Sequence, residues 1–549
     1  MTPDGRRTFF RHLLALDLMI VAIGVGYLAP ESPALLFGAF LAAVAVAAWM
    51  GGDEVGLAAT AYAVIALSLF FGASTDVASL TAFAATGAVL ASIVRVIDVG
   101  RAEARREEIS IAQVEARATT IGIAYGLPLL IMVMYTDISD VLMRKAPVPS
   151  LLQPLIVLLA VAVFRARRVL RPATAAFHPL VAAFVCYALV VFSTSIWARD
   201  VRLVDATFGE VLKALFICIL TATLAASWSS LKRAFAALIA TAAVLAGTSV
   251  VQITTGRFMD AFLGLVTPQS GTIYERIAMP RAAGPPNSDP NFYARILLIV
   301  IPLAVGLALT EKSLKRRVVF AIGAAVITAG TLVTYSRGAM LAVAVMAVLL
   351  LLGLRVRPRN IALAGVGGLV LLLLMPSAIS RRFLTIETLM PDYDTTFTYD
   401  SSVEKRKLLV RSGIAMFEAN PFAGIGAGNY PRMYVRYANE IGSSWMDYHA
   451  AGTDEHPHGL YFEIAAETGL LGLTAFAAIV IVTLLSLERS RRLLLARGRA
   501  DLSIIAMTVS IAIVSYLVAS VFLHETHLRY PALYFGFAMA VARLSKEPE

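Results

Sequence analysis

Residues 454–486 read DEHPHGLYFEIAAETGLLGLTAFAAIVIVTLLS, in which a polar head passes directly into a long apolar run. The apolar part, near 459–486, is long enough to cross the roughly 30 Å of hydrocarbon in a bilayer as a helix. The first half of the stretch also holds two imidazoles, His456 and His458, and four carboxylates. Imidazole is the side chain best suited to proton transfer near neutral pH, although paired histidines can also simply cap a helix. The stretch therefore predicts a membrane helix with candidate proton-transfer residues at its start.

The composition of the whole chain is that of an integral membrane protein. Of its 549 residues, 58% are apolar and 15% are charged, and the mean hydropathy is +0.76, which is too apolar for a soluble domain. Apolar runs of helical length recur from end to end, without the short alternating strands of a membrane barrel. We therefore predict an all-α polytopic membrane protein with about 16 transmembrane helices.

The predicted spans follow one another along the chain with few long interruptions. The first is expected to be an anchor rather than a cleaved signal peptide, because it passes straight into a second span. Both cysteines, Cys186 and Cys218, fall inside spans, which argues against a disulfide framework or a thiolate metal site. The spans are predicted near 13–30, 33–50, 55–73, 78–98, 119–135, 149–164, 177–197, 208–228, 233–252, 291–309, 318–334, 338–354, 360–376, 459–486, 502–523 and 530–544.

Lysine and arginine gather in the short loops on one side of this arrangement, which predicts that side to be cytoplasmic. Both termini are then cytoplasmic in a multi-pass protein, and the net charge of +10 is explained without nucleic acid. Two long loops, near 254–290 and 377–458, then lie outside. The basic loop residues are Arg165, Arg167, Arg168, Arg171, Lys232, Arg233 and those within 312–317, 355–359 and 489–499.

Two arginines also fall on the outer side of the predicted topology, the same side as the two histidines. Arg281 precedes Asp289-Pro290, which has the form of an N-cap followed by proline at the first helical position. Arg337 falls between two apolar runs, at or within the outer leaflet. An arginine at that depth either snorkels to the surface or serves a site.

The loop 377–458 carries two further patterns. The spacing of apolar residues from Arg406 to Phe417 predicts a short helix that lies on the membrane surface. The segment 420–429, NPFAGIGAGN, places three glycines at every second position. It lacks the full spacing of a nucleotide-binding fingerprint and no strand is predicted before it, so we expect a tight turn rather than a Rossmann-type site.

The order of these motifs resembles the O-antigen ligase and polymerase superfamily over about residues 118–545. The ordered set is Arg281 before Gly...Asp289-Pro-Asn291, then Ser-Arg337-Gly, then the glycine segment 420–429, then His458 and Glu467-Thr-Gly-Leu-Leu-Gly472. Many members have His-Asn where this chain has His458-Gly459. The first four helices and a cytoplasmic linker, 1–117, look like an addition to a ligase-like domain of about twelve helices, 118–549.

The resemblance implies an inverting, metal-independent glycosyltransferase without a cofactor. The donor would be a glycan linked to polyprenyl diphosphate, and the acceptor a glycan or a lipid A core, at the periplasmic face of the inner membrane. Ligase and polymerase share these motifs, so either activity fits.

The resemblance also implies roles for individual residues. Arg281 and Arg337 would bind the diphosphate, because guanidinium forks bind phosphate oxygens at two points, and Arg411 is a third candidate for that role. His458 would be the general base, with His456 as second choice. Asp289, Asn291 and Glu463 are supporting candidates, and Asp454, Glu455 or Glu463 could orient the imidazole.

Two other classes of protein remain as alternatives. A transporter or flippase for lipid-linked glycans could use the same arginines, but such proteins are often built from internal repeats and none is evident here. A zinc hydrolase could use His456, His458, His524, Glu525 and His527. The segment His524-Glu-Thr-His527 is one residue short of the His-Glu-X-X-His motif.

Overall fold

The computed structural model describes residues 125–137, 152–165, 179–257, 262, 265–267, 281–285, 289–354, 401–441, 455–457, 459–524 and 528–547. All regular secondary structure in these ranges is helical. Five helical segments there are long and apolar enough to cross a membrane, so the chain is an all-helical, polytopic membrane protein. The predicted spans within 1–117 and near 360–376 lie outside the described ranges. The five segments are Pro179–Ile196, Trp228–Thr255, Pro290–Thr310, Leu460–Ala496 and Ala500–Phe522.

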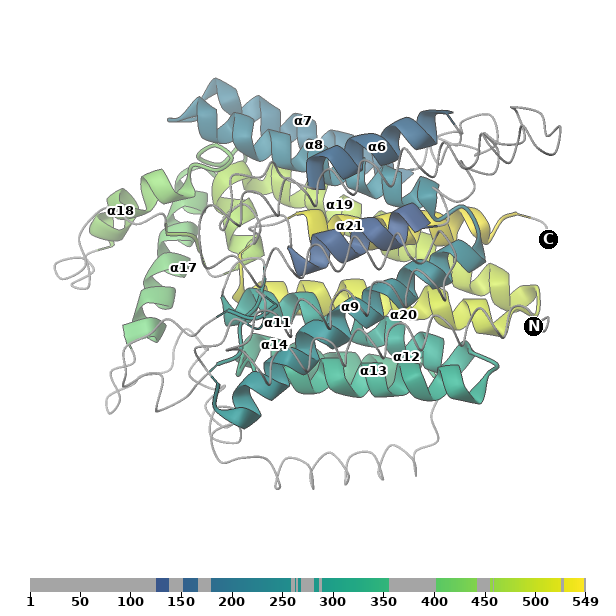
Figure 1. The fold of residues 1–549 in the computed structure, drawn as a ribbon. Coiled ribbons are helices and arrows are strands. Elements are labelled where there is room, and N and C mark those ends of the chain that lie inside the picture. Colours follow the sequence, from purple (N-terminus) through teal and green to yellow (C-terminus); the bar gives the residue numbers. More distant parts are fainter. Residues whose placement is uncertain are drawn as a thin grey trace, which may run out of the picture. The chain divides into compact units, whose positions relative to one another are not determined.

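The chain divides into two compact units. The described helices belong to the unit of residues 122–136 and 155–549, except that the first three residues of α6 (Leu152–Arg165) fall in the other unit. Figure 1 shows the long helices of this unit side by side, with α17 and α18 at one end of them. In chain order the helices are Tyr125–Thr136, α6 (Leu152–Arg165), α7 (Pro179–Ser193), η3 (Thr194–Ile196), α8 (Val201–Leu224), α9 (Trp228–Thr255), α11 (Pro290–Leu298), α12 (Ile301–Thr310), α13 (Leu314–Leu332), α14 (Arg337–Gly353), α17 (Ser401–Ala419), α18 (Tyr430–Glu440), α19 (Leu460–Ala496), α20 (Ala500–Ala519), η7 (Ser520–Phe522) and α21 (Arg529–Leu544).

Two predicted spans differ from the observed helices for identifiable reasons. α8 begins at Val201, seven residues before the predicted span at 208, because the Asp200 side chain accepts from the Arg202 amide and caps the helix. The span predicted at 291–309 is two helices, α11 and α12, with an interruption at 299–300 just before Pro302. This proline cannot donate the helical hydrogen bond from its position. The short helix α18 was not predicted.

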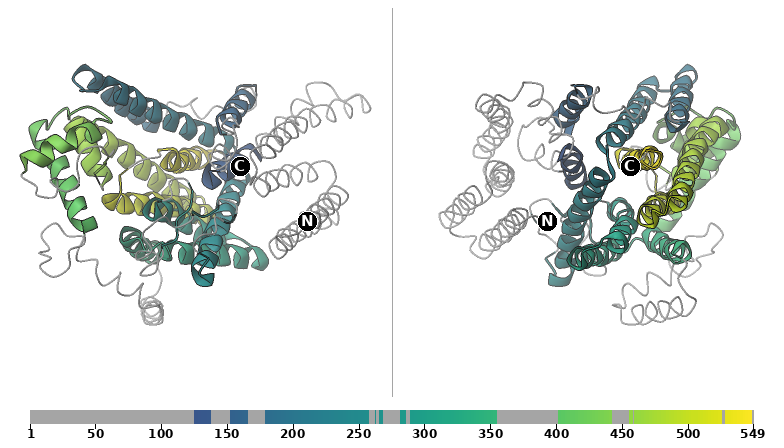
Figure 2. Two further views of the ribbon diagram at one scale, coloured as in Figure 1. Left: turned by 60° about the vertical axis from the view of Figure 1, so that its left-hand side comes forward. Right: turned by 90° about the vertical axis from the view of Figure 1, so that its right-hand side faces the viewer.

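The core of this unit is formed around α21, nearly all of whose residues are buried. α21 packs against α8, α9, α19 and α20, and the right-hand view of Figure 2 shows it, in yellow, enclosed by other helices. A glycine allows its close approach to α8: a Cβ at Gly536 would lie 2.7 Å from the Cys218 carbonyl oxygen. Small residues at helix contacts are the usual means of packing helices in membranes.

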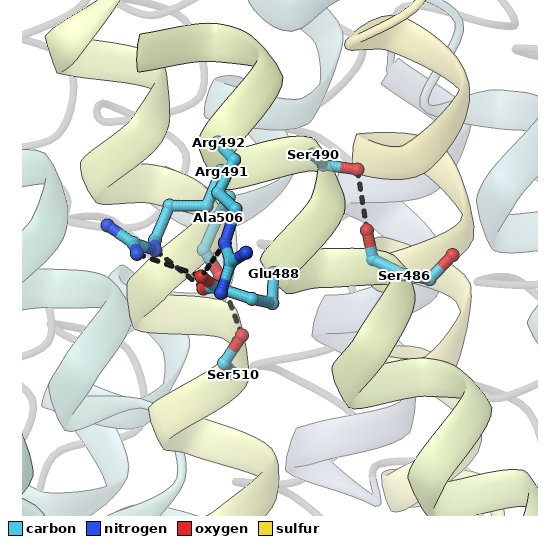
Figure 3. Close-up of polar contacts among 7 residues, drawn as sticks. All are labelled: Ser486, Glu488, Ser490, Arg491, Arg492, Ala506 and Ser510. Atoms are coloured by element: carbon cyan, nitrogen blue, oxygen red, sulfur yellow. Dashed lines mark hydrogen bonds and ion pairs between the residues drawn. The ribbon is translucent and has the colours of Figure 1, made fainter. Parts of the chain in front are cut away.

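The far end of α19 extends ten residues beyond the span predicted to end at 486. Glu488 accepts hydrogen bonds there from the Nε atoms of Arg491 at 2.6 Å and Arg492 at 2.7 Å (Figure 3). Such pairs three and four residues apart stabilise a helix outside the apolar region. Hydropathy therefore locates the membrane segment but not the end of this helix.

Candidate active site

The glycine segment 420–429 forms the predicted tight turn. Gly424, Gly426 and Gly428 all have positive φ, at 69°, 109° and 72°. This left-handed region is readily available only to glycine. The turn lies against α19, where the Ile425 amide donates to the Ala466 carbonyl at 3.0 Å and the Gly426 amide to the Glu467 carbonyl at 2.9 Å.

α19 is broken where the turn meets it. Gly469 has φ 63° and ψ −159°, which is not helical. The amides of Leu470 and Leu471 donate to the carbonyls of Pro421 and Phe422, at 2.8 and 3.2 Å. The two glycine motifs of the sequence are therefore one structural unit, a pairing that the sequence interpretation did not anticipate.

Glu467 fixes the remainder of the turn through its side chain. Its Oε2 accepts from the Gly428 amide at 2.8 Å and its Oε1 from the Tyr430 amide at 3.1 Å. Burial, together with the nearby carboxylates of Glu463 and Glu467, raises the pKa of Tyr430 well above its usual range. Tyr430 therefore stays a hydroxyl and donates to the Leu409 carbonyl of α17.

The turn is also tied to the connection between α7 and α8. The Trp197 indole Nε1 donates to the Gly424 carbonyl at 3.0 Å. The buried Asn429 side chain accepts from the Asp200 amide at 2.8 Å and donates to the Asp200 carbonyl at 3.1 Å. The start of α19 thus rests on a network of backbone and side-chain hydrogen bonds.

The first imidazole of the candidate site lies just before α19. His456 Nδ1 is 2.9 Å from Oε1 of Glu463, whose side chain is only 11% exposed. The His456 ring stacks on the ring of His524, with centroids 4.8 Å apart and planes inclined by 2°. His458, the first choice for the base, lies outside the described ranges.

Three arginines line one small cavity near the same end of the helices. Arg281 comes from the segment before α11, Arg337 is the first residue of α14, and Arg295 lies within α11. The cavity holds about 30 Å³. Tyr335 also lines it in a left-handed conformation, with φ 52°, an uncommon conformation for a residue other than glycine.

Predicted supporting residues hold Arg281 in this cavity. Its Nη2 donates to the Asn291 side-chain oxygen at 2.8 Å, and its Nε to the Thr334 carbonyl at 3.0 Å. Asp289 caps α11 through the amides of Asn291 and Phe292, at 2.6 and 3.2 Å. The predicted N-cap and proline start of this helix are confirmed.

Arg295 was missed by the sequence interpretation. Its side chain is 3% exposed. Its guanidinium lies 5.0 Å from the Phe292 ring centroid and 4.8 Å from that of Tyr516, and its Nη1 donates to the Ser520 hydroxyl at 3.1 Å. The signal in the sequence was an arginine inside an otherwise apolar predicted span.

The segment that follows α20, with η7, lies between the arginine cavity and the imidazoles. Phe522 and Leu523 line the cavity, and His524, the next residue, carries the ring on which His456 stacks. The Leu460 amide at the start of α19 donates to the Leu523 carbonyl at 3.1 Å. The two groups of functional side chains are therefore neighbours across residues 519–524.

A second, larger cavity of about 420 Å³ has His456 in its lining. Its walls come from α7, α8, α19, α20 and α21 and are mostly apolar, with rings from Tyr187, Phe476 and Tyr534. Glu463 and Glu467 are its acidic residues on α19, whereas Glu210 and Lys213 line it from α8, where they form an ion pair at 2.7 Å.

Residues 322–477 match the family model described as O-antigen ligase. The chain carries an O-antigen ligase family domain. No curated protein matched the chain.

The O-antigen ligase domain contains only part of this assembly. Arg337, the glycine turn, His456 and Glu463 fall within the matched residues. Arg281 and Arg295 precede the match and His524 follows it. The cavity arginines and the stacked imidazoles are therefore brought together by the fold from three parts of the chain.

The structure does not bring Arg411 to the other predicted residues. It is exposed on α17 and does not line the arginine cavity. Within the described ranges no group of three or more His, Cys, Asp or Glu side chains is arranged to hold a metal ion. Glu525 and His527, two members of the alternative zinc set, lie outside those ranges.

Proposed function

We propose that the protein is an inverting, metal-independent glycosyltransferase that transfers a glycan from a polyprenyl diphosphate lipid to an acceptor sugar. It would act as an O-antigen ligase or a surface-polysaccharide polymerase at the periplasmic face of the inner membrane, with both termini cytoplasmic. The observation that carries the proposal is the arginine cavity next to the His456–Glu463 pair, across residues 519–524, in a membrane protein with an O-antigen ligase domain.

The arginines would stabilise the leaving group. When the bond between the anomeric carbon and the diphosphate breaks, its electron pair and the growing negative charge leave with the diphosphate. Guanidinium groups bind phosphate oxygens at two points and stay charged at any physiological pH. Arg281, held by Asn291 and Thr334, and Arg337 would supply that charge from fixed positions, which lowers the barrier without reorganisation.

A histidine would activate the acceptor. As the acceptor hydroxyl oxygen bonds to the anomeric carbon, its proton passes to an imidazole nitrogen. We assign this base to His458, which precedes Gly459 at the start of α19, with His456 as second choice. Attack opposite the departing diphosphate inverts the anomeric centre, so the base and the anion site must lie on opposite sides of the sugar.

The larger cavity would take part of the isoprenoid chain. Its walls are mostly apolar and it extends from His456 between helices long enough to cross the membrane. Burial of an apolar chain there would be favoured by the hydrophobic effect.

The test is transfer of a lipid-linked glycan by purified protein. Loss of two charge-assisted hydrogen bonds, each worth about 1.5 to 3 kcal/mol, predicts that Arg281→Ala or Arg337→Ala lowers kcat/KM by roughly 10² to 10⁴-fold. Lysine at either position should rescue poorly, because an ammonium group cannot make the planar two-point contact. Arg492→Ala, an exposed arginine near the far end of α19, is the matched control and should retain activity. Full activity of both cavity variants would refute the proposal.

Addition of EDTA to the same assay tests separately whether transfer requires a metal ion. The guanidinium groups already supply the positive charge that a metal ion would bring to a diphosphate, so EDTA should leave the rate unchanged. Loss of transfer with EDTA and recovery with zinc would make the histidines metal ligands instead.

A further inference from the structure

Arg295 is an arginine of the small cavity to which the proposed function gives no role. Within the described ranges it is the only lysine or arginine whose side chain is buried. Taking a guanidinium out of water is unfavourable unless other groups compensate. The rings of Phe292 and Tyr516 and the Ser520 hydroxyl are among the groups that contact it.

The position of Arg295 relates it to the arginine cavity. It lines the same 30 Å³ space as Arg281 and Arg337, from a different element. A site needs about 10 to 15 Å³ of such space for each water molecule, so the cavity has room for about two, or for oxygens of a phosphoryl group, but not for a sugar ring. All the charged residues in its described lining are arginines.

The neighbours of Arg295 orient it. The Ser520 hydroxyl accepts from its Nη1 at 3.1 Å and itself donates to the Tyr516 carbonyl at 2.8 Å. The Phe292 ring, on the same helix, packs edge-on against His524 with centroids 5.0 Å apart. Stacking on aromatic rings and a hydroxyl contact fix the plane of a guanidinium, and its five N–H donors all lie in that plane.

We propose that Arg295 is the third guanidinium of this anion site and makes it select a diphosphate ester over a monophosphate ester. The inference rests on the proposed function. Two guanidinium groups are enough to bind one phosphoryl group at two points each. The second phosphoryl group of a diphosphate brings further charge and acceptor oxygens. A third arginine, itself buried, stabilises that added charge in a site of low dielectric, where charge interactions are strong.

The experiment measures binding of two soluble probes, farnesyl diphosphate and farnesyl monophosphate, to the purified full-length protein. The wild-type protein should prefer the diphosphate at least tenfold. Arg295→Met should raise the Kd for the diphosphate about 10 to 100-fold, the loss of one charge-assisted contact, and the Kd for the monophosphate less than about threefold. The preference should therefore collapse.

Two more variants keep the test decisive if Arg295→Met does not fold. Ser520→Ala removes the hydroxyl that orients Arg295 without touching the cavity lining, and should lower the diphosphate preference at least about threefold. Arg295→Lys keeps the charge but not the planar fork, and should do the same. The matched control is Arg529→Met, which removes an arginine that stacks on Tyr530 at 5.2 Å and lines neither cavity. Both Kd values should be unchanged.

The outcomes separate this inference from the proposed function. If Arg281→Ala raises the Kd of both probes while the Arg295 and Ser520 variants leave the ratio of the two Kd values unchanged, Arg295 is structural and the proposed function stands. The same conclusion follows if the Arg295 variants raise both Kd values by the same factor. If the wild-type protein binds neither probe, both proposals fail.

Discussion

His456 and Glu463 stabilise each other at the entrance of α19. Glu463 lies in the first helical turn, where the N-terminal end of the helix favours a negative charge. Its partner His456 precedes Pro457, which is buried, and the Gly459 amide donates to the Pro457 carbonyl at 2.8 Å. The chain on both sides of position 458 is thus anchored. We expect this pair to position the base rather than to be the base.

A double-mutant cycle tests that positioning role. His456→Ala and Glu463→Ala should each lower kcat about tenfold with little change in KM, and the double variant should also lose only about tenfold, because the two residues act as a unit. His458→Ala should lose nearly all transfer while still binding the lipid-linked donor. The measurement is steady-state transfer with purified protein.

The opposite result would assign the general base to His456 instead of His458. If His456→Ala is inactive and His458→Ala retains transfer, His456 is the base and Glu463 its orienting carboxylate. Additive losses of about tenfold each would show that the pair does not act as a unit.

Single arginines show where sequence reasoning reaches its limit. Arg281 and Arg337 could be proposed because Arg281 lies in an outer loop shortly before a predicted span and Arg337 falls between two apolar runs. Arg295 stands inside a run, and whether it faces lipid, solvent or a cavity depends on the rotation of α11 about its axis. That rotation is set by packing against α13, α14 and α20, which a single sequence does not reveal.

At the scale of elements, the contact between the glycine turn and the break in α19 leaves no space for an added side chain. A Cβ at Gly424 would lie 2.3 Å from the backbone carbon and oxygen of Glu467, which cannot move aside as a flexible side chain can. Gly424 also has φ 69°, which disfavours any other residue. The segment 420–429 is thus fitted to α19 at its backbone.

Gly424→Ala should therefore destabilise the protein far more than its backbone angle alone requires. The matched control is Gly256→Ala, at the C-cap of α9, which has the same φ of 69° but no atom within 4 Å of the added Cβ. The control should cost about 1 kcal/mol and Gly424→Ala more than about 3 kcal/mol. Melting in detergent followed by tryptophan fluorescence measures both, since Trp197 donates to the Gly424 carbonyl. Equal melting temperatures for the two variants would contradict this account.

Most of the described helices could be predicted because membrane spans need only length and apolarity. The missed features have other causes. α18 begins at Tyr430 with Pro431 at its start and is rich in tyrosine and arginine, so it has no apolar run to reveal it. It forms because Tyr430, Tyr434 and Tyr437 pack with Leu409 and Met416 of α17. The pairing of the turn with α19 is likewise tertiary, joining residues far apart in the sequence.

At the scale of the whole molecule, the candidate site depends on the ends of several helices that meet at one cavity. α11 and α14 begin there, and α20 ends there. This end of the helices is the proposed periplasmic face. The match to the O-antigen ligase family covers 322–477 and so includes only one of the three cavity arginines. A fragment limited to the matched residues would lack Arg281, Arg295 and His524, so activity should require the flanking helices.

The proposed orientation puts this face on the periplasmic side and the far end of α19 in the cytoplasm, which can be tested by labelling. Cys186 and Cys218 would first be replaced by alanine, since both lie in helices of the described part of the chain. Asn439→Cys, exposed near the end of α18, should react with an impermeant maleimide in intact spheroplasts. Ala496→Cys, exposed at the last residue of α19, should react only after the membrane is opened, because the positive-inside rule puts the arginine-rich segment 489–499 in the cytoplasm.

Labelling of Ala496→Cys alone in intact spheroplasts would reverse the orientation and put the arginine cavity on the cytoplasmic side. Labelling of both would mean that α19 does not cross the membrane.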